Sequence, residues 1–122
     1  MIVVDSCGWL EYFSAGPLAE KFYPYLKDLH KVIVPTIVIY EVYKKIKREA
    51  GEEKALLAVA QMQSAVIAPF TNGAVLLAAD VSLANSLPMA DAIVYATAKI
   101  ENAKLVTSDE HFAGLDSVEY IH

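Results

Sequence analysis

Four acidic side chains stand at positions in the sequence that suggest a role in a functional site. Asp5 directly follows the apolar run "MIVV", and Asp109 comes two residues after the apolar run "KLVT". Asp91 lies near the start of the small and apolar stretch "ADAIVYATA", and Glu41 interrupts the apolar segment "TIVIYEVYKKI". If these four acids converge in a cleft, their mutual repulsion requires a positive group among them.

The positive group that suits such a cluster is a hard cation. No lysine or arginine stands in these segments as an obvious internal partner. Carboxylate oxygens are the ligands that Mg²⁺ and Mn²⁺ prefer, whereas a calcium loop motif is missing from the sequence. A carboxylate-held Mg²⁺ keeps waters and takes phosphate oxygens as its remaining ligands, so we expect hydrolysis of a phosphodiester without a protein nucleophile.

Each acid also has a structural interpretation in which it only stabilises a helix. Asp5 and Asp109 could cap the elements that follow them, and Asp91 lies in a first helical turn, where a carboxylate meets unpaired N–H groups. Glu41 could pair with Lys45 four residues later, which stabilises a helix by a few tenths of a kcal/mol. Each structural interpretation is reasonable alone, but four separate structural roles explain the pattern less well than one shared site does.

The elements that must position these acids alternate between two periodicities. Short apolar runs, which are typical of strands buried on both faces, occupy residues 1–4, 31–34, 64–70, 103–107 and, more weakly, 117–121. Helical patterns lie between them, at residues 9–13, 18–29, 35–50, 52–62, 73–85 and 91–101. The alternation predicts an α/β fold with a central, mostly parallel sheet of about five strands and helices on both faces.

The predicted sheet brings the acids toward one edge. In sheets of this kind the functional cleft lies beyond the carboxyl ends of the strands. Asp5 and Asp109 both follow a strand directly, so they share that edge if their strands are parallel neighbours. Glu41 lies one turn into the helix after the run 31–34 and borders the face that packs on the sheet.

Composition limits the class of protein. With 122 residues, 56% of them hydrophobic, the chain is expected to form one domain, residues 1–122, with a real core. Fifteen acidic and ten basic residues give a net charge of −5, which argues against a protein that coats nucleic acid by charge alone.

A basic cluster follows Glu41 on the same helix. Lys44, Lys45, Lys47 and Arg48 form either a solvated helix face or a rim that positions phosphates, and the candidate RNA contacts are Lys44, Lys47 and Arg48. Both interpretations stay open at this point.

The remaining reactive side chains and the chain start point to a cytoplasmic protein. The single cysteine, Cys7, suits a reducing compartment and is interpreted as packed and inert. One Cys and three scattered His form no paired zinc motif. Met1 leads straight into apolar residues and an acid without a basic or long apolar leader, and polar residues interrupt the run 55–79, so we expect no membrane segment.

The motifs resemble those of a known family. "VVDSCGWLEYF", "VPTIVIYEVYKKI", "MADAIVYATA" and "LVTSDEHF" resemble the four motifs of the PIN-domain family and, within it, the VapC-like toxin ribonucleases of toxin–antitoxin pairs. The match spans residues 2–112 in the family's order, and its specificity lies in the set. It implies a PIN-like three-layer α/β/α fold, cleavage of single-stranded RNA by a Mg²⁺- or Mn²⁺-dependent endoribonuclease, a homodimer and a cognate antitoxin.

The resemblance also implies roles for individual residues. The metal-binding and catalytic acids would be Asp5, Glu41, Asp91 and Asp109. Thr107 would be a supporting hydroxyl, and Ser6, which stands where many relatives carry Thr, keeps a hydroxyl there. Asp80 adds an acid in the preceding helix, which we interpret as solvated.

Three functions are consistent with these residues. The first is a toxin ribonuclease with a cognate antitoxin, the second a stand-alone PIN-type nuclease in RNA processing or decay, and the third an inactive PIN-fold binding module. Retention of all four acids disfavours the third, since a module without catalysis would gain stability by replacing repelling carboxylates. A small upstream gene for a DNA-binding antitoxin would separate the first from the second.

Overall fold

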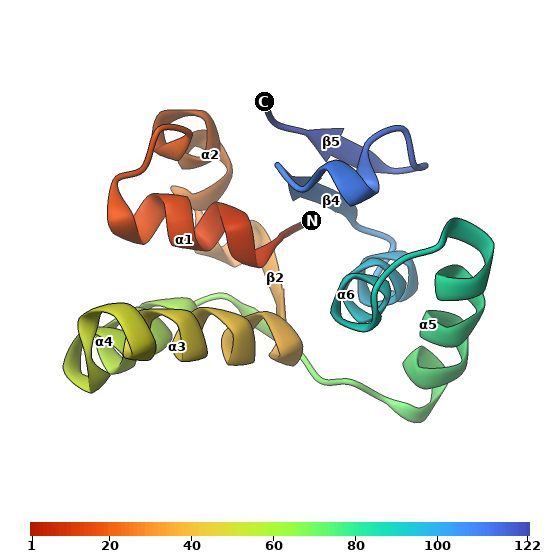
Figure 1. Ribbon diagram of the computed structural model, residues 1–122, viewed down its shortest axis with the longest axis horizontal. Helices are drawn as coiled ribbons and strands as arrows, with labels where there is room; N and C mark the ends of the chain where they lie inside the picture. The colour runs from red at the N-terminus through yellow and green to blue at the C-terminus, as the bar shows by residue number, and fades with distance from the viewer.

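Five short strands form one all-parallel sheet in the computed structural model, which describes all 122 residues (Figure 1). The spatial order is β3-β2-β1-β4-β5. The strands are β1 (Ile2–Val4), β2 (Val32–Pro35), β3 (Val66–Ala68), β4 (Lys104–Thr107) and β5 (Val118–Tyr120). The three inner strands are largely buried, whereas the edge strands β3 and β5 are half-exposed, which explains why "SVEYI" is the weakest apolar run.

Six helices cover the sheet in a three-layer α/β/α arrangement, which confirms the predicted fold class. They are α1 (Ser6–Ser14), α2 (Ala19–Leu26), α3 (Thr36–Ala50), α4 (Glu52–Met62), α5 (Asn72–Asn85) and α6 (Met89–Ile100), with short 3₁₀ helices η1 (Leu29–Lys31) and η2 (Glu110–Phe112). They pack in consecutive pairs, α1 with α2, α3 with α4 and α5 with α6, and Figure 1 shows these pairs as three groups around the strands. No helix by itself is long and apolar enough to cross a membrane, and the α5–α6 pair, which passes that test only in combination, is bent by 116°.

The order in which strands are added to the sheet reverses at its central strand, β1. From β1 the chain adds β2 and then β3 on one side, and α5 and α6 carry it back to β4 on the other side of β1. Val4 pairs with Val106, and the Asp5 N–H extends this pairing by donating to the Val106 carbonyl at 3.0 Å. Such a reversal leaves a crevice beyond the carboxyl ends of the two strands.

Helix α6 runs through the core, which explains the composition of "ADAIVYATA". Its residues 92–98 are all buried, so the helix needs small and apolar side chains on every face. Its two buried hydroxyls are satisfied, since Tyr95 donates to the Asp116 carbonyl and Thr97 to the Ile93 carbonyl, both at 2.8 Å. Asp91 stands at the end of this helix that emerges toward the crevice.

The predicted element boundaries differ from the observed ones mainly at helix starts. The helix predicted at residues 9–13 begins at Ser6, because Asp5 caps it through the Ser6 N–H. The helix predicted at 18–29 ends at Leu26, and the separate turn η1 follows. The helix predicted to start at Asp91 starts at Met89, which places Asp91 in its first turn.

A glycine in α1 lets this helix approach the sheet. A Cβ on Gly8 would lie 2.6 Å from Val4 Cγ1 and 2.7 Å from the Phe22 ring, and both of these side chains are fully buried. We expect Gly8→Ala to lower the free energy of unfolding by about 1–3 kcal/mol, measured by urea denaturation. Gly73→Ala is the control, because its nearest neighbour is 4.0 Å away, and it should stabilise by about 0.4–1 kcal/mol. Equal effects of the two substitutions would contradict this account of the packing.

Candidate active site

Asp5 is the most deeply placed of the four acids. Its side chain caps α1 by accepting the Ser6 N–H on Oδ1 at 2.8 Å, and its Oδ2 accepts the Thr107 hydroxyl at 2.8 Å. Only 4% of the residue is exposed. Burial raises the pKa of Asp5 from 3.8 to about 6, against the opposing hydrogen bonds, and the charges of Asp91 and Asp109 add to the rise.

Thr107 joins two of the acids at the end of β4. Its fully buried hydroxyl donates to Asp5 Oδ2 and accepts the Asp109 N–H at 3.0 Å. Asp109 in turn caps η2, because its Oδ1 accepts the His111 N–H at 2.9 Å. Asp5 and Asp109 therefore both cap an element, and both follow strands that are parallel neighbours, so capping does not separate them.

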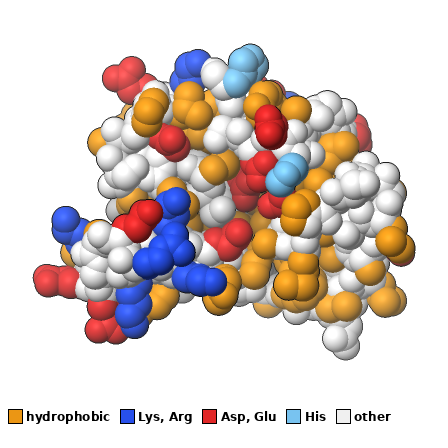
Figure 2. Space-filling view, in the orientation of Figure 1, with side chains coloured by type: hydrophobic (Ala, Val, Ile, Leu, Met, Phe, Trp, Pro, Cys, Tyr) orange, Lys and Arg blue, Asp and Glu red, His pale blue; other side chains and the backbone are white.

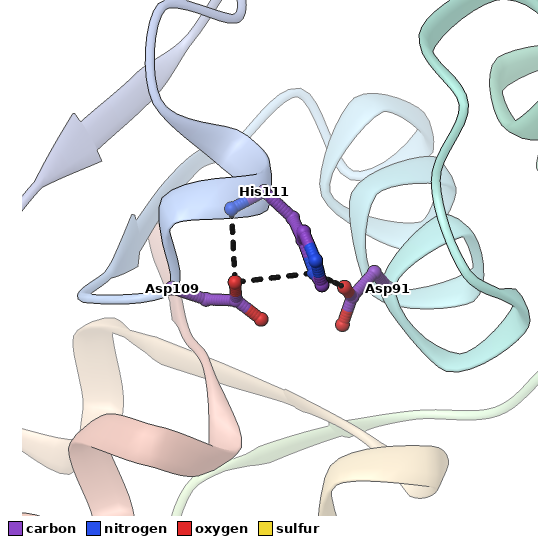
Figure 3. Close-up of side chains that lie close together, drawn as sticks. All are labelled: Asp91, Asp109 and His111. Atoms are coloured by element: carbon purple, nitrogen blue, oxygen red, sulfur yellow. Dashed lines mark hydrogen bonds and ion pairs between the residues drawn. The ribbon is translucent and has the colours of Figure 1, made fainter.

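Asp91 lies close to Asp109, and the side chain of His111 contacts both (Figure 3). His111 Nδ1 is 2.9 Å from Asp91 Oδ2 and 3.3 Å from Asp109 Oδ1. Burial is the main cause that raises the pKa of Asp91, with the Asp109 charge adding to it and the His111 bond opposing it. The hydrogen bond to Asp91 and the charge of Asp109 raise the pKa of His111.

Glu41, on α3, lies near enough to the other three acids for their charges to act on it. Burial raises the pKa of Glu41 from 4.5 to about 7, and the charges of Asp5, Asp91 and Asp109 add to the rise, while a hydrogen bond from Ser6 opposes it. The alternative pair with Lys45 does not form, because Lys45 Nζ lies 3.9 Å from Glu49 Oε1 instead. Glu41 has no salt bridge at all.

The acid cluster (Asp5, Glu41, Asp91 and Asp109) is therefore short of positive charge. No lysine or arginine pairs with any of its members, and His111 is the one basic side chain in contact with it. Figure 2 shows the acidic side chains gathered in the middle of one face with a histidine beside them. Burial raises the pKa values of Asp5, Glu41 and Asp91, and no lysine or arginine pairs with them. Such carboxylate oxygens fit a hard divalent cation, whose charge would favour their ionised forms.

Basic side chains line a hollow that includes Glu41. Two of the three predicted RNA contacts, Lys44 and Arg48, line it, and Lys47 does not. Lys44, Lys45 and Arg48 line a hollow of about 290 Å³ together with Glu41, since residues 41, 44, 45 and 48 share one face of α3. The predicted contact Lys47 lies outside the hollow, because it is turned one position away and pairs with Glu52 at 3.6 Å. In Figure 2 the basic atoms form a band next to the acidic centre.

Cys7 adjoins the cluster without being activated. Its Sγ lies 3.4 Å from Thr107 Oγ1 and accepts the Ser108 N–H at 3.4 Å. Burial and the charge of Asp5 raise the pKa of the Cys7 thiol, so it stays protonated and is a poor nucleophile. This agrees with the interpretation of Cys7 as inert.

Sequence reasoning missed His111 as a member of the site. The signal was available, because His111 stands two residues after Asp109 in "TSDEHF". A 3₁₀ turn at that point folds the imidazole back over the capping carboxylate. Asp80, by contrast, is exposed on α5 as expected and contacts no member of the cluster.

The sequence profile of the PIN domain matches residues 2–118. The chain belongs to the PIN domain family. Solved structures share the fold of this PIN domain. A toxin–antitoxin complex from Klebsiella pneumoniae is 20% identical with a TM-score of 0.82, covering 99% of this chain and all of the other. VapBC2 from Rickettsia felis, bound to a promoter DNA fragment, is 18% identical with a TM-score of 0.79, covering 98% of both chains.

A third structure of this fold is that of a toxin with a known target. VapC20 from Mycobacterium tuberculosis, described as a toxin that cleaves the sarcin–ricin loop, is 18% identical with a TM-score of 0.78 and covers 97% of this chain and 98% of its own. At these identities the likeness establishes the fold of the PIN domain. No curated protein matches the chain significantly in sequence.

The raised pKa values predict an unusual pH dependence of stability in the cation-free PIN domain. Asp5 and Glu41 have pKa values of about 6 and about 7 in the folded state against 3.8 and 4.5, so the folded protein binds more protons than the unfolded chain in this range. Their contribution to stability is fully present below about pH 4 and is lost as the pH rises through about 7.

The test compares wild type with Asp5→Asn by thermal melting in EDTA between pH 4.5 and 7.5. The melting temperature of the variant should rise relative to that of the wild type as the pH rises, because the variant lacks one of the two groups that lose protons in this range. A constant difference across this range would contradict the raised pKa of Asp5.

Proposed function

We propose that this PIN domain is a Mg²⁺- or Mn²⁺-dependent endoribonuclease that cleaves single-stranded RNA in the cytoplasm and serves as the toxin of a toxin–antitoxin pair. The observation that carries the proposal is the acid cluster with its deficit of positive charge at the point where the strand order reverses. Asp5, Glu41, Asp91 and Asp109 would hold the cation. A bound divalent cation supplies Lewis-acid polarisation of the scissile phosphate and lowers the pKa of an attacking water.

The chain's own residues orient the reaction. The Ser6 N–H fixes Oδ1 of Asp5, and the Thr107 hydroxyl, with the Cys7 thiol at 3.8 Å, fixes Oδ2. Asp109 is held by Thr107 and by its cap on η2, and Asp91 by the rigid buried helix α6. Attack by water on the phosphorus, with O3′ as the leaving group, would give a 5′-phosphate and a 3′-hydroxyl, and the RNA 2′-hydroxyl would take no part.

Substitution of the acids separates this function from a capping role. Asp5→Asn, Asp91→Asn and Asp109→Asn should each lower the rate of RNA cleavage by ~10²-fold or more, the scale for losing one preorganised electrostatic group. The melting temperature in EDTA should be unchanged or higher, because Asn still caps and one repelling charge is gone. Asp80→Asn is the control, with no effect expected on either quantity. Lower melting temperatures with intact cleavage would make the acids structural.

The basic hollow would position RNA phosphates beside the acid cluster. Lys44 and Arg48 are exposed and share the hollow with Glu41, whereas Lys47 pairs with Glu52. Replacing Lys44 and Arg48 by Gln should weaken binding of all RNA sequences alike and reduce the salt slope by about 0.7 for each lost contact. Lys47→Gln is the matched control from the same helix. A salt slope unchanged in the double variant would assign these side chains to solvated surface.

We also propose an antitoxin partner, and a groove that supports it adjoins the site. The groove, about 540 Å³ between α1, α3 and α4, is lined by apolar side chains including Leu10, Phe13, Ile46 and Leu57. Leu10 and Lys45 also line the basic hollow, so the two depressions are neighbours. An apolar antitoxin segment seated in the groove would reach the entrance to the acid cluster and block RNA.

A homodimer is the third part of the proposal, and α5 supports it. This helix buries mainly alanines toward the protein and exposes large apolar side chains, among them Leu76, Leu83 and the nearby Met89. Large apolar side chains gathered on the exposed face of a helix indicate a surface that a partner covers. The exposed face of α5 would be covered by a second copy of the chain.

Two exposed leucines provide reciprocal tests of these partners. Leu57 in the groove and Leu83 on α5 are 65% and 86% exposed, so Glu at either position should not disturb the core. Leu57→Glu should weaken capture of the protein encoded by the adjacent upstream gene and leave the mass by light scattering dimeric. Leu83→Glu should give a monomer. An upstream product that does not bind the wild type would leave a stand-alone nuclease as the better account.

A further inference from the structure

The imidazole of His111 shares one small volume with two carboxylates. Its Nδ1 and one oxygen each of Asp91 and Asp109 all lie within 4.8 Å of one another (Figure 3). The backbone beneath the ring is fixed, since the His111 N–H donates to Asp109 Oδ1 at 2.9 Å. The three groups come from the start of α6 and from the 3₁₀ turn η2, two elements packed at the same end of the sheet.

We propose that His111 is itself a ligand of the divalent cation, so that this site binds a transition cation such as Mn²⁺ in preference to Mg²⁺. The inference rests on the proposed function, because it deepens the same metal site. It adds one nitrogen ligand to a set that sequence reasoning described as all-oxygen. His111, Asp91 and Asp109 then form one side of the coordination shell.

The distances are those of neighbouring ligands. Ligand atoms about 2.1 Å from an octahedral cation lie roughly 3 Å apart when they occupy adjacent positions. Nδ1 lies 2.9 Å from Asp91 Oδ2 and 3.3 Å from Asp109 Oδ1, so the cation could enter with small side-chain adjustments. Imidazole nitrogen favours transition cations, whereas carboxylate oxygens alone suit Mg²⁺ and Mn²⁺ alike.

The same geometry would also suit a simple ion pair, in which His111 occupies the place of the cation. The two arrangements predict opposite effects of removing the imidazole. A ligand strengthens cation binding, so its removal weakens it, whereas a competing ion-pair partner weakens cation binding, so its removal strengthens it. The His111 side chain is 54% exposed, which leaves space for Ala without a buried cavity.

The chain offers a matched control for His111. Asp28 and His30 repeat the arrangement of Asp109 and His111, since Asp28 Oδ1 accepts the His30 N–H at 3.2 Å at the start of η1. His30 is exposed and contacts no member of the acid cluster. His30→Ala therefore removes an equivalent imidazole from an equivalent turn outside the site.

The experiment uses Mn²⁺ alone as the probe. Wild type, His111→Ala and His30→Ala are titrated with Mn²⁺ and with Mg²⁺ by calorimetry, and the Mn²⁺-loaded proteins are examined by electron spin echo envelope modulation for coupling to a directly bound imidazole ¹⁴N. We expect ¹⁴N coupling in wild type and in His30→Ala, and its loss in His111→Ala. Mn²⁺ affinity should fall at least about tenfold in His111→Ala, the scale for losing a group at a metal site, and Mg²⁺ affinity should fall less.

The outcomes separate this inference from the proposed function. Mn²⁺ that binds the wild type without ¹⁴N coupling would overturn the ligand role of His111 and leave the carboxylate site intact. Tighter Mn²⁺ binding by His111→Ala would overturn it as well and identify the competing ion pair. No binding of either cation to wild type would overturn the proposed metal site together with this inference. The coupling is measured on wild type, so the decision does not depend on the variant folding.

Discussion

Burial of carboxylates that the fold holds near one another is the constraint on which the rest of this structure depends. Parallel pairing of β1 with β4 fixes where Asp5 and Asp109 emerge, and the buried helix α6 fixes Asp91. None of these elements can move apart without exposing core valines or breaking the pairing. Burial in this place is the main cause that raises the pKa values of Asp5, Glu41 and Asp91, and the charges of the neighbouring acids add to the rise.

Hydrogen bonds that stabilise the fold also aim the acids. The Thr107 hydroxyl bridges Asp5 and the Asp109 N–H, and the two aspartates cap α1 and η2. Each cap uses one oxygen of its carboxylate. The same two side chains therefore begin a helix and belong to the acid cluster. A cation at this place would thus bind to side chains that are already oriented.

Much of this arrangement could be predicted from the sequence, because it follows from periodicity. The apolar runs before Asp5 and Asp109 fix both acids at strand ends, and one parallel sheet puts those ends together. The small side chains that follow Asp91 indicate a helix buried on all sides. These features follow from local sequence patterns that are compatible with few other secondary structures.

The rest depends on side-chain contacts between distant segments. The contact of His111 with Asp91 joins residues twenty positions apart, and no local pattern specifies it. Lys45 lines the basic hollow and Lys47 does not. This difference depends on how α3 is rotated about its axis where it packs on the protein, which the sequence pattern does not specify to within one residue. The absent Glu41–Lys45 pair reflects the burial of Glu41 among the acids, whereas Lys45 stays at the surface beside Glu49.

Proton release on cation binding tests the central claim most directly. Isothermal titration of the wild type with Mg²⁺ or Mn²⁺ at pH 6, repeated in buffers of different ionisation enthalpy, counts the protons that leave the protein. The account predicts binding with net release of protons, because Asp5 and Glu41 have pKa values of about 6 and about 7 and a cation requires them ionised. Binding without proton release, or no binding at millimolar cation, would contradict it.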